Sequence, residues 1–166
     1  MKETATTKQT SGKGFSFENK VCSYFAVQML AKVSFPFRNA DIIELAFQRK
    51  RHGWLLDDVV LALCSRTDQF HAALSVKSNQ QFGVRSAPSD FVANAWQQYL
   101  REGTDVFDPS RDLLGLVTAP LPEPPRSAVH ALLAKASQLS PSDLDATMVS
   151  PEKTASEVER ALYDSL

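Results

Sequence analysis

The stretch from Gly53 to Gln81, GWLLDDVVLALCSRTDQFHAALSVKSNQQ, constrains the fold of this chain more than any other. Two of its segments, Asp57 to Cys64 and Phe70 to Ser78, are rich in β-branched and apolar residues, which favour extended strands. The five polar residues between them have the length of a hairpin connection. The pattern predicts a β-hairpin around which the rest of the chain is built.

Alternate residues of a strand share a face, which places particular charges together. Lys77 lies on the same face as Ser75, within small and polar neighbours. On the partner strand Asp58 shares its side with small residues, whereas Asp57 lies with larger apolar ones. If the bulky faces pack inward together, Asp58 is the carboxylate that lies beside Lys77.

An aspartate and a lysine at this position permit two interpretations. The carboxylate can bind a hard divalent cation such as Mg²⁺, or Mn²⁺, which polarises a phosphate while the lysine orients water or neutralises developing charge. The simpler interpretation is a cross-strand ion pair that contributes little to stability. The hairpin alone favours the ion pair, so the rest of the chain has to decide.

Two further acids lie at unusual places. Glu18 falls at the N-terminal end of the buried stripe of an amphipathic helix that the spacing predicts from Phe15 to about Val33. Glu44 lies within the apolar run Asp41 to Gln48, a predicted strand. A carboxylate near a helix N-terminus also has an ordinary explanation, because it interacts favourably with the helix dipole. Each acid is therefore a candidate ligand with a structural alternative.

Composition limits the classes of protein to consider. The 166 residues suffice for one core, and an apolar content of 43% is that of an ordinary globular protein. No membrane span or signal peptide is recognisable, so we expect a cytoplasmic protein. Cys22 and Cys64 are expected to be free thiols. The net charge of −1 excludes a general basic coat, so any nucleic-acid contact has to be local, as in the cluster Arg49, Lys50 and Arg51.

The remaining elements follow in order along the chain. Residues 1–14 are expected to form a flexible tail, and residues 15–120 one domain. Within this domain a helix is predicted after Pro88, capped by Ser89 or Asp90, with Trp96 in its apolar face. Leu113 to Thr118 is predicted to be a strand buried on both faces. A proline-rich connector spans 121–126, and 127–166 is expected to form a helical extension.

The order of helix, three strands, helix and strand resembles that of the restriction-endonuclease-like PD-(D/E)XK nucleases. The resemblance implies an α/β fold, an αβββαβ core with a mixed central sheet flanked by helices, followed here by a C-terminal helical appendix. Five blocks are similar to the N-terminal nuclease domain of bacterial antiphage effectors, namely the CD-NTase-associated double-stranded DNA endonucleases and the antiviral STAND NTPases: GFSFENKVCSYFAV, IIELAFQRKRHGWLLDDVV, ALSVKSNQQF, APSDFVANAWQQYL and RDLLGLVTAP.

This resemblance implies Mg²⁺-dependent (or Mn²⁺-dependent) cleavage of double-stranded DNA, with little sequence specificity, in antiphage defence. Asp58 would be the principal metal ligand and Lys77 the catalytic lysine. Further candidates for the metal site are Glu18, Glu44, the Val76 carbonyl and Asp57, with Ser75 at the family's acidic position. The candidate DNA contacts are Arg49, Lys50, Arg51, Gln80 and Gln81.

Position 75 departs from the family pattern, because it is a serine where relatives carry an acid or glutamine. A hydroxyl is a weak neutral ligand, although Mg²⁺ is often held by only one or two carboxylates. The alternative is therefore a catalytically inactive nuclease-like fold that serves as a DNA-binding or assembly module. An unrelated α/β interaction domain is a third possibility.

The resemblance also implies partners. Duplex cleavage needs two active sites, so we expect a homo-oligomer, a dimer or tetramer, formed through the full-length protein. In such effectors the nuclease is fused to NTPase and sensor domains, and we expect this chain to be a fragment that leads into them. The chain itself contains no GxxxxGK[ST] phosphate-binding loop, and no membrane partner is expected.

Overall fold

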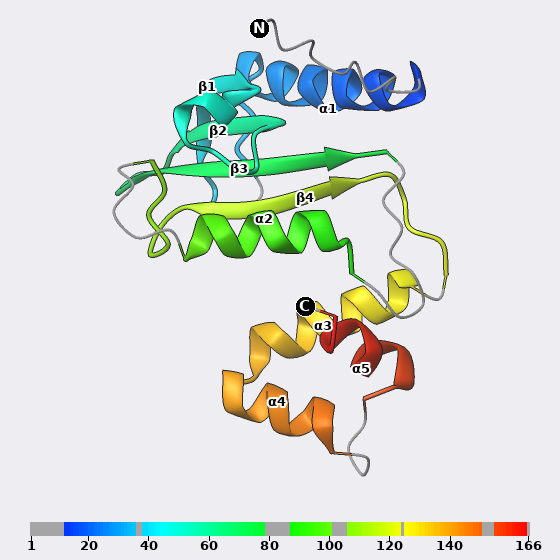
Figure 1. Ribbon diagram of the computed structural model, residues 1–166. Helices are drawn as coiled ribbons and strands as arrows, with labels where there is room; N and C mark the ends of the chain where they lie inside the picture. Colours follow the sequence, from blue (N-terminus) through cyan, green and yellow to red (C-terminus); the bar gives the residue numbers. More distant parts are fainter. Residues whose placement is uncertain are drawn as a thin grey trace, which may run out of the picture.

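The computed structural model describes residues 12–35, 38–78, 87–100, 106–123, 125–150 and 155–165. Its centre is a four-stranded sheet of β1 (Asp41–Phe47), β2 (Val59–Cys64), β3 (Gln69–Lys77) and β4 (Leu113–Thr118), with the strands in the order of the sequence (Figure 1). β2 is antiparallel to both β1 and β3, and β4 is parallel to β3. The fold is therefore α/β with a mixed open sheet.

Helices cover both faces of this sheet. On one face lies α1 (Gly12–Leu30), and on the other lies α2 (Ser89–Tyr99), which connects β3 to the parallel strand β4 (Figure 1). A short 3₁₀ helix, η1 (Arg49–His52), lies between β1 and β2. Three more helices, α3 (Pro125–Gln138), α4 (Pro141–Val149) and α5 (Glu157–Tyr163), form a separate group beyond α2. No helix among the described residues is long and apolar enough to cross a membrane.

The two faces of the hairpin strands bury different side chains. Beneath α1, alternate residues of β2 and β3, such as Leu61, Phe70 and Leu74, pack with Val21 and Phe25 of the helix. On the α2 side the cluster consists of Trp54, Leu56, Val60, Ala73 and Phe107, against which Phe91 and Ala95 of α2 pack. Full burial of each large apolar side chain contributes roughly 1.5–3 kcal/mol, so both faces hold the hairpin in place.

The predicted hairpin is confirmed, with small differences at its ends. Val59 pairs with Leu74, and Cys64 pairs with Gln69. The turn between the strands is closed by the Ser65 amide, which donates to the Asp68 carbonyl at 2.9 Å. β2 begins at Val59, two residues after the predicted start. Both aspartates therefore precede the strand and lie at its open end.

The predicted alternation within β1 is wrong at one point. A register shift between Ile42 and Glu44 marks a bulge, and an extra residue in one strand reverses the faces that follow. Ile42 therefore joins the core beneath α1, while Ala46 packs in the opposite cluster. Ile43 is 52% exposed. Strict alternation along a strand would place Ile42, Glu44 and Ala46 on one side.

The helix α2 also differs from the prediction in its orientation. Its N-cap is Pro88, with no side-chain cap hydrogen bond, rather than Ser89 or Asp90. Trp96, expected in the core, is 51% exposed, whereas Gln98 is fully buried. The Gln98 Oε1 accepts a hydrogen bond from the Leu55 amide at 2.6 Å. The buried side of α2 thus combines Phe91 and Ala95 with a polar contact to the segment before β2.

The ends of other elements shift as well. The helix α1 begins at Gly12, within the stretch expected to be a tail, and ends at Leu30 rather than Val33. The strand β4 matches its predicted bounds, but its residues are half-buried rather than buried on both faces. It is the last strand of the sheet and pairs only with β3 among the described residues. The expected helical extension contains α3, α4 and α5, and α3 begins at Pro125, inside the expected connector.

The helical group has a core of its own. Residues of all three helices contribute to it, namely Ala128, Leu132, Met148, Ala155 and Leu162. Its buried acid, Glu159, receives a hydrogen bond from the Lys135 ammonium at 2.8 Å. Ser156 and Glu159 also form a capping box at the start of α5. The contact of Lys135 with Glu159 joins α3 to α5, and the capping box fixes the start of α5.

Candidate functional site

The open end of the β2 and β3 pair brings together the predicted catalytic residues. The carboxylate oxygen Oδ2 of Asp58 accepts three hydrogen bonds: from the Val76 amide at 2.7 Å, the Lys77 Nζ at 3.0 Å and the Ser75 Oγ at 3.1 Å. Asp58 therefore lies beside Lys77, and the side chains do not point to opposite faces. The expected meeting of an acid and an amine at this edge is confirmed.

The register of the hairpin explains this arrangement. Because Val59 pairs with Leu74, Asp58 lies across from Ser75, just beyond the last backbone pair of β2. The Val76 amide faces that side and has no strand residue opposite it there. The carboxylate of Asp58 takes the place of a backbone carbonyl as its acceptor, satisfying an amide that would otherwise lack a partner.

The site is open to solvent on one side. The side chain of Lys77 is 42% exposed and that of Asp58 is 26% exposed, while Ser75 beneath them is buried. A half-exposed ion pair contributes little to stability. The hydrogen bonds to the buried amide and hydroxyl are therefore what fix the carboxylate, and Lys77 remains accessible from outside.

Glu18 of α1 is the second acid of this site. Burial raises the pKa of its carboxyl above the ordinary value, the negative charge of Asp58 raises that pKa further, and the Lys77 ammonium acts in the opposite direction. These interactions place Glu18 near both residues although it comes from a third element. The two carboxylates repel each other, and a cation between them would relieve that repulsion.

Cys22 was not predicted to belong to this site. It is a free, half-buried thiol, and burial raises its pKa, with further increases from the charges of Glu18 and Asp58. The protonated thiol is thus the favoured form, and a reactive thiolate is disfavoured. A signal existed in the sequence, because Cys22 follows Glu18 by one helical turn on the same stripe.

Two other predicted ligands lie beside Asp58 in different ways. The Val76 carbonyl faces the same edge as its amide, because the two groups of one strand residue point to the same neighbour in an antiparallel pair. The Asp57 carbonyl accepts a hydrogen bond from the Arg49 amide at 3.3 Å. The basic turn η1 is thereby attached directly next to the site.

Glu44 does not join the Asp58 site. It pairs with Ala62, which lies four residues along β2 from Asp58, or about 13 Å at the usual rise per strand residue. Its carboxylate lies 3.2 Å from Arg49 Nη2 in an exposed ion pair. This separation along the sheet and the pairing with Arg49 keep Glu44 away from the Asp58 carboxylate, so its position does not support its prediction as a ligand of the same metal.

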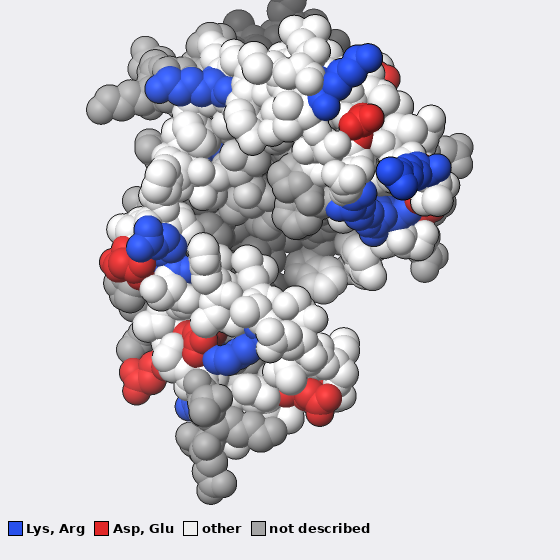
Figure 2. All heavy atoms as spheres, turned by 180° about the vertical axis from the view of Figure 1, so that it is seen from behind, with Lys and Arg blue, Asp and Glu red and all other residues white. Residues whose placement is uncertain are grey.

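The predicted DNA contacts are only partly described. Arg49 is half-buried and paired with Glu44, and the side chains of Lys50 and Arg51 lie outside the described part of the chain, as do Gln80 and Gln81. On the face shown in Figure 2, Lys and Arg side chains form separate groups with uncharged surface between them. The described residues on this face therefore form no continuous basic surface.

A buried acid beside His71 was also missed. Asp112 has a side chain that is 1% exposed; its Oδ1 accepts from the His71 amide at 2.8 Å and lies 3.6 Å from the His71 Nδ1. Its Oδ2 accepts from the Asp108 amide. Asp112 lies in a turn before β4, far from His71 in sequence, so no local pattern indicated it. Asp112 accepts hydrogen bonds from two backbone amides, which indicates a structural role for this residue.

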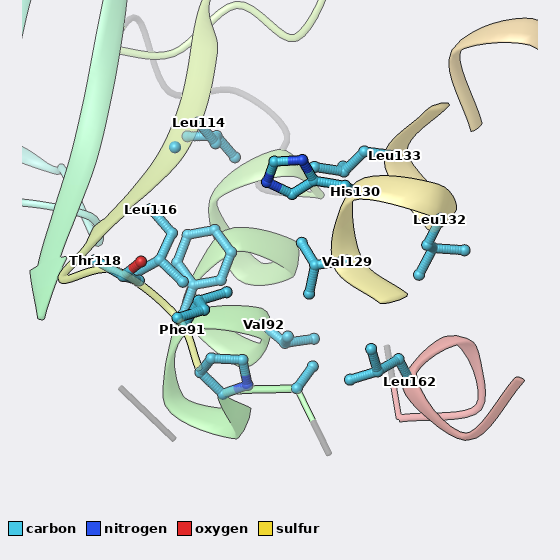
Figure 3. A pocket seen from close by; sticks show the side chains of 14 residues that line it. Phe91, Val92, Leu114, Leu116, Thr118, Val129, His130, Leu132, Leu133 and Leu162 are labelled. Atoms are coloured by element: carbon cyan, nitrogen blue, oxygen red, sulfur yellow. The ribbon is translucent and has the colours of Figure 1, made fainter. Parts of the chain in front are cut away.

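The structure also contains an apolar cavity of about 440 Å³ away from these charges. Figure 3 shows it between α2 and β4 on one side and α3 with α5 on the other. Its walls include Phe91, Leu114, Leu116, Val129 and Leu162, with His130 and Thr118 among the few polar side chains. The described residues that line it include no carboxylate and no cysteine, so the Asp58 site is the better candidate for chemistry.

Comparisons with models of protein families, with curated proteins and with solved structures found no match. The function therefore has to be argued from the site itself. Among the described residues, no three His, Cys, Asp or Glu side chains form a ready-made metal cluster. The pair Asp58 and Glu18, with the adjacent Val76 carbonyl, nevertheless fits a hard cation that keeps several of its waters.

Proposed function

We propose that this chain is a metal-dependent endonuclease effector that hydrolyses phosphodiester bonds of double-stranded DNA with little sequence specificity, in bacterial antiphage defence. Its fold would be the restriction-endonuclease-like one. The observation that carries the proposal is the contact of Lys77 Nζ with Asp58 Oδ2 at 3.0 Å, at the ends of adjacent antiparallel strands and near the acid Glu18 of the first helix. This set follows the PD-(D/E)XK arrangement at Asp58 and Lys77.

Each residue has a task that its position allows. Asp58 and Glu18 would hold Mg²⁺ or Mn²⁺, which supplies Lewis-acid polarisation of the scissile phosphate when bound. Lys77, which is partly exposed, can donate hydrogen bonds to the attacking water and to the phosphate oxygens as negative charge develops. The basic turn at Arg49, attached beside Asp57, would contact the DNA backbone, which carries no sequence information.

The architecture of the activated protein follows from the substrate. Cutting both strands of a duplex requires two active sites, so we propose a homo-oligomer as the active form. The fusion to NTPase and sensor domains known from the similar effectors would supply the assembly. The chain described here would then be the catalytic part, with Mg²⁺ as the cofactor and double-stranded DNA as the partner.

The alternative is a nuclease-like fold without catalysis that serves as a DNA-binding or assembly module. Ser75 favours it, because this position lacks the second carboxylate of the family pattern. Supercoiled plasmid incubated with the chain in Mg²⁺, Mn²⁺ or EDTA separates the two functions. Cation-dependent nicking supports the endonuclease, whereas a gel shift of DNA without nicking in any cation supports the inactive module.

A further inference from the structure

The hydrogen bonds to Asp58 are unevenly divided between its two carboxylate oxygens. All three that the described residues make end on Oδ2, from Val76, Lys77 and Ser75. A carboxylate oxygen offers about two lone-pair sites, so three donors leave Oδ2 no capacity for a cation. Oδ1 is the oxygen that remains for one.

We propose that Ser75 is a positioning residue and not a metal ligand: its hydroxyl holds Oδ2 of Asp58 so that the carboxylate presents Oδ1 to a single divalent cation. The inference rests on the proposed function and assigns a task to the residue that departs from the family pattern. In place of the second strand carboxylate of the family pattern, the serine orients Asp58, and Glu18 of α1 remains the other carboxylate near the cation.

The surroundings of Ser75 support this task. The residue is 6% exposed, and its hydroxyl proton is directed to Asp58 at 3.1 Å. A hydroxyl committed in this way is a poor competitor with water for Mg²⁺, which gives up its water ligands reluctantly. The Ser75 hydroxyl and the Val76 amide both donate to the Asp58 carboxylate from the buried side. The carboxylate is therefore oriented before any cation binds, which reduces the entropy lost on binding.

A positioning role predicts effects that depend on Asp58. Ser75→Ala should weaken Mn²⁺ binding by about 3- to 10-fold, the loss expected for one hydrogen bond. Ser75→Thr keeps the hydroxyl and should restore most of the affinity. In an Asp58→Asn background, Ser75→Ala should cause no further loss, because the residue then has no carboxylate to orient.

The experiment is a Mn²⁺ titration of the full chain followed by electron paramagnetic resonance of the free ion, on the unmodified protein and these variants. We expect one Mn²⁺ at the site. We also expect that Ser75→Ala weakens Mn²⁺ binding in the unmodified background but not in the Asp58→Asn background. An equal loss on Ser75→Ala with and without Asp58 would make Ser75 a direct ligand and overturn the proposal. An unchanged affinity in Ser75→Ala would overturn it as well.

Hydrogen exchange of the Val76 amide provides a second readout that does not depend on a variant folding. If the cation binds Oδ1, adding Mg²⁺ should leave this amide as protected as before, whereas loss of protection would show that the cation displaces it from Oδ2. Mn²⁺ binding without DNA cleavage would leave the role of Ser75 intact and overturn only the proposed function. Absence of Mn²⁺ binding would overturn both.

Discussion

The ammonium of Lys77 lies 3.0 Å from Oδ2 of Asp58 across the open end of the β2 and β3 pair. The hairpin register that pairs Val59 with Leu74 creates this contact. A slip of one residue would send the two side chains to opposite faces of the sheet. The two buried faces of the hairpin therefore fix the geometry of the site, since only one register buries both apolar rows.

The two partners of this ion pair should contribute differently to stability. Asp58→Ala leaves the Val76 amide and the buried Ser75 hydroxyl without their acceptor and should lower the free energy of unfolding by about 1–3 kcal/mol. Lys77→Ala removes a half-exposed charge and should cost less than about 1 kcal/mol. Urea denaturation in EDTA measures both. Equal losses would mean that the ion pair, and not the buried hydrogen bonds, fixes the carboxylate.

Glu18→Gln should stabilise the fold at neutral pH. The pKa of Glu18 is raised by burial and by Asp58, so the folded state disfavours its charged form, and stability falls as the pH rises through the raised pKa. Glutamine removes that penalty. Below about pH 4, where carboxyl groups also protonate in the unfolded chain, the two proteins should converge.

The comparison for Glu18→Gln is a set of melting temperatures from pH 3 to 8 in about 50 mM salt, where screening is still modest. Adding Mg²⁺ should raise the melting temperature of the unmodified protein more than that of the variant, because the cation relieves repulsion that the variant lacks. A variant that is less stable at neutral pH would mean that Glu18 makes a favourable structural contact instead.

Gly115→Ala should destabilise the pairing of β3 with β4. An added Cβ would lie 2.7 Å from Cδ2 of Leu74, which is directly opposite in the register and buried. The leucine has to shift within a packed core, at a cost of about 1–3 kcal/mol. The double variant with Leu74→Ala should show a smaller effect of the added methyl group, measured as a double-mutant cycle in urea. If the losses of stability from Gly115→Ala and Leu74→Ala were additive, the close approach of the added Cβ to the Leu74 side chain would be contradicted.

Glu159→Gln should loosen the group of helices α3, α4 and α5. Burial acts to raise the pKa of Glu159, but hydrogen bonds from Lys135 and Ser156 outweigh it and hold the pKa below its ordinary value. The carboxylate thus stabilises the group above the ordinary carboxyl pKa, and this contribution is lost as the pH falls through the lowered pKa. Hydrogen exchange in α5 should quicken in the variant at pH 7, whereas Glu157→Gln, with its exposed side chain, serves as the matched control.

Sequence reasoning succeeded where a short pattern decides the structure. The apolar runs flanking a polar turn predicted both hairpin strands, and the contrast between bulky and small rows selected Asp58 over Asp57 as the partner of Lys77. Leu113 to Thr118 was also predicted with its observed bounds. In each case the local sequence pattern and the tertiary packing favour the same strand and the same side-chain placement.

The errors arise where a contact distant in sequence overrides a local pattern. The bulge between Ile42 and Glu44 reverses a face of β1, and nothing in the apolar alternation marks it. Gln98 is buried and accepts a hydrogen bond from the Leu55 amide, whereas Trp96 is half-exposed. Asp112 meets His71 only because β4 lies beside β3. These placements depend on tertiary pairing that periodicity does not contain.

The most direct measurement is plasmid cleavage by four forms of the chain in Mg²⁺ and in EDTA: unmodified, Asp58→Asn, Lys77→Ala and Glu44→Gln. Glu44 is the matched control, since it is a carboxylate of the same sheet whose partner is Arg49. The account predicts cation-dependent cutting by the unmodified chain and by Glu44→Gln, and none by the Asp58 and Lys77 variants, all four remaining folded. Full activity of either Asp58→Asn or Lys77→Ala would contradict it.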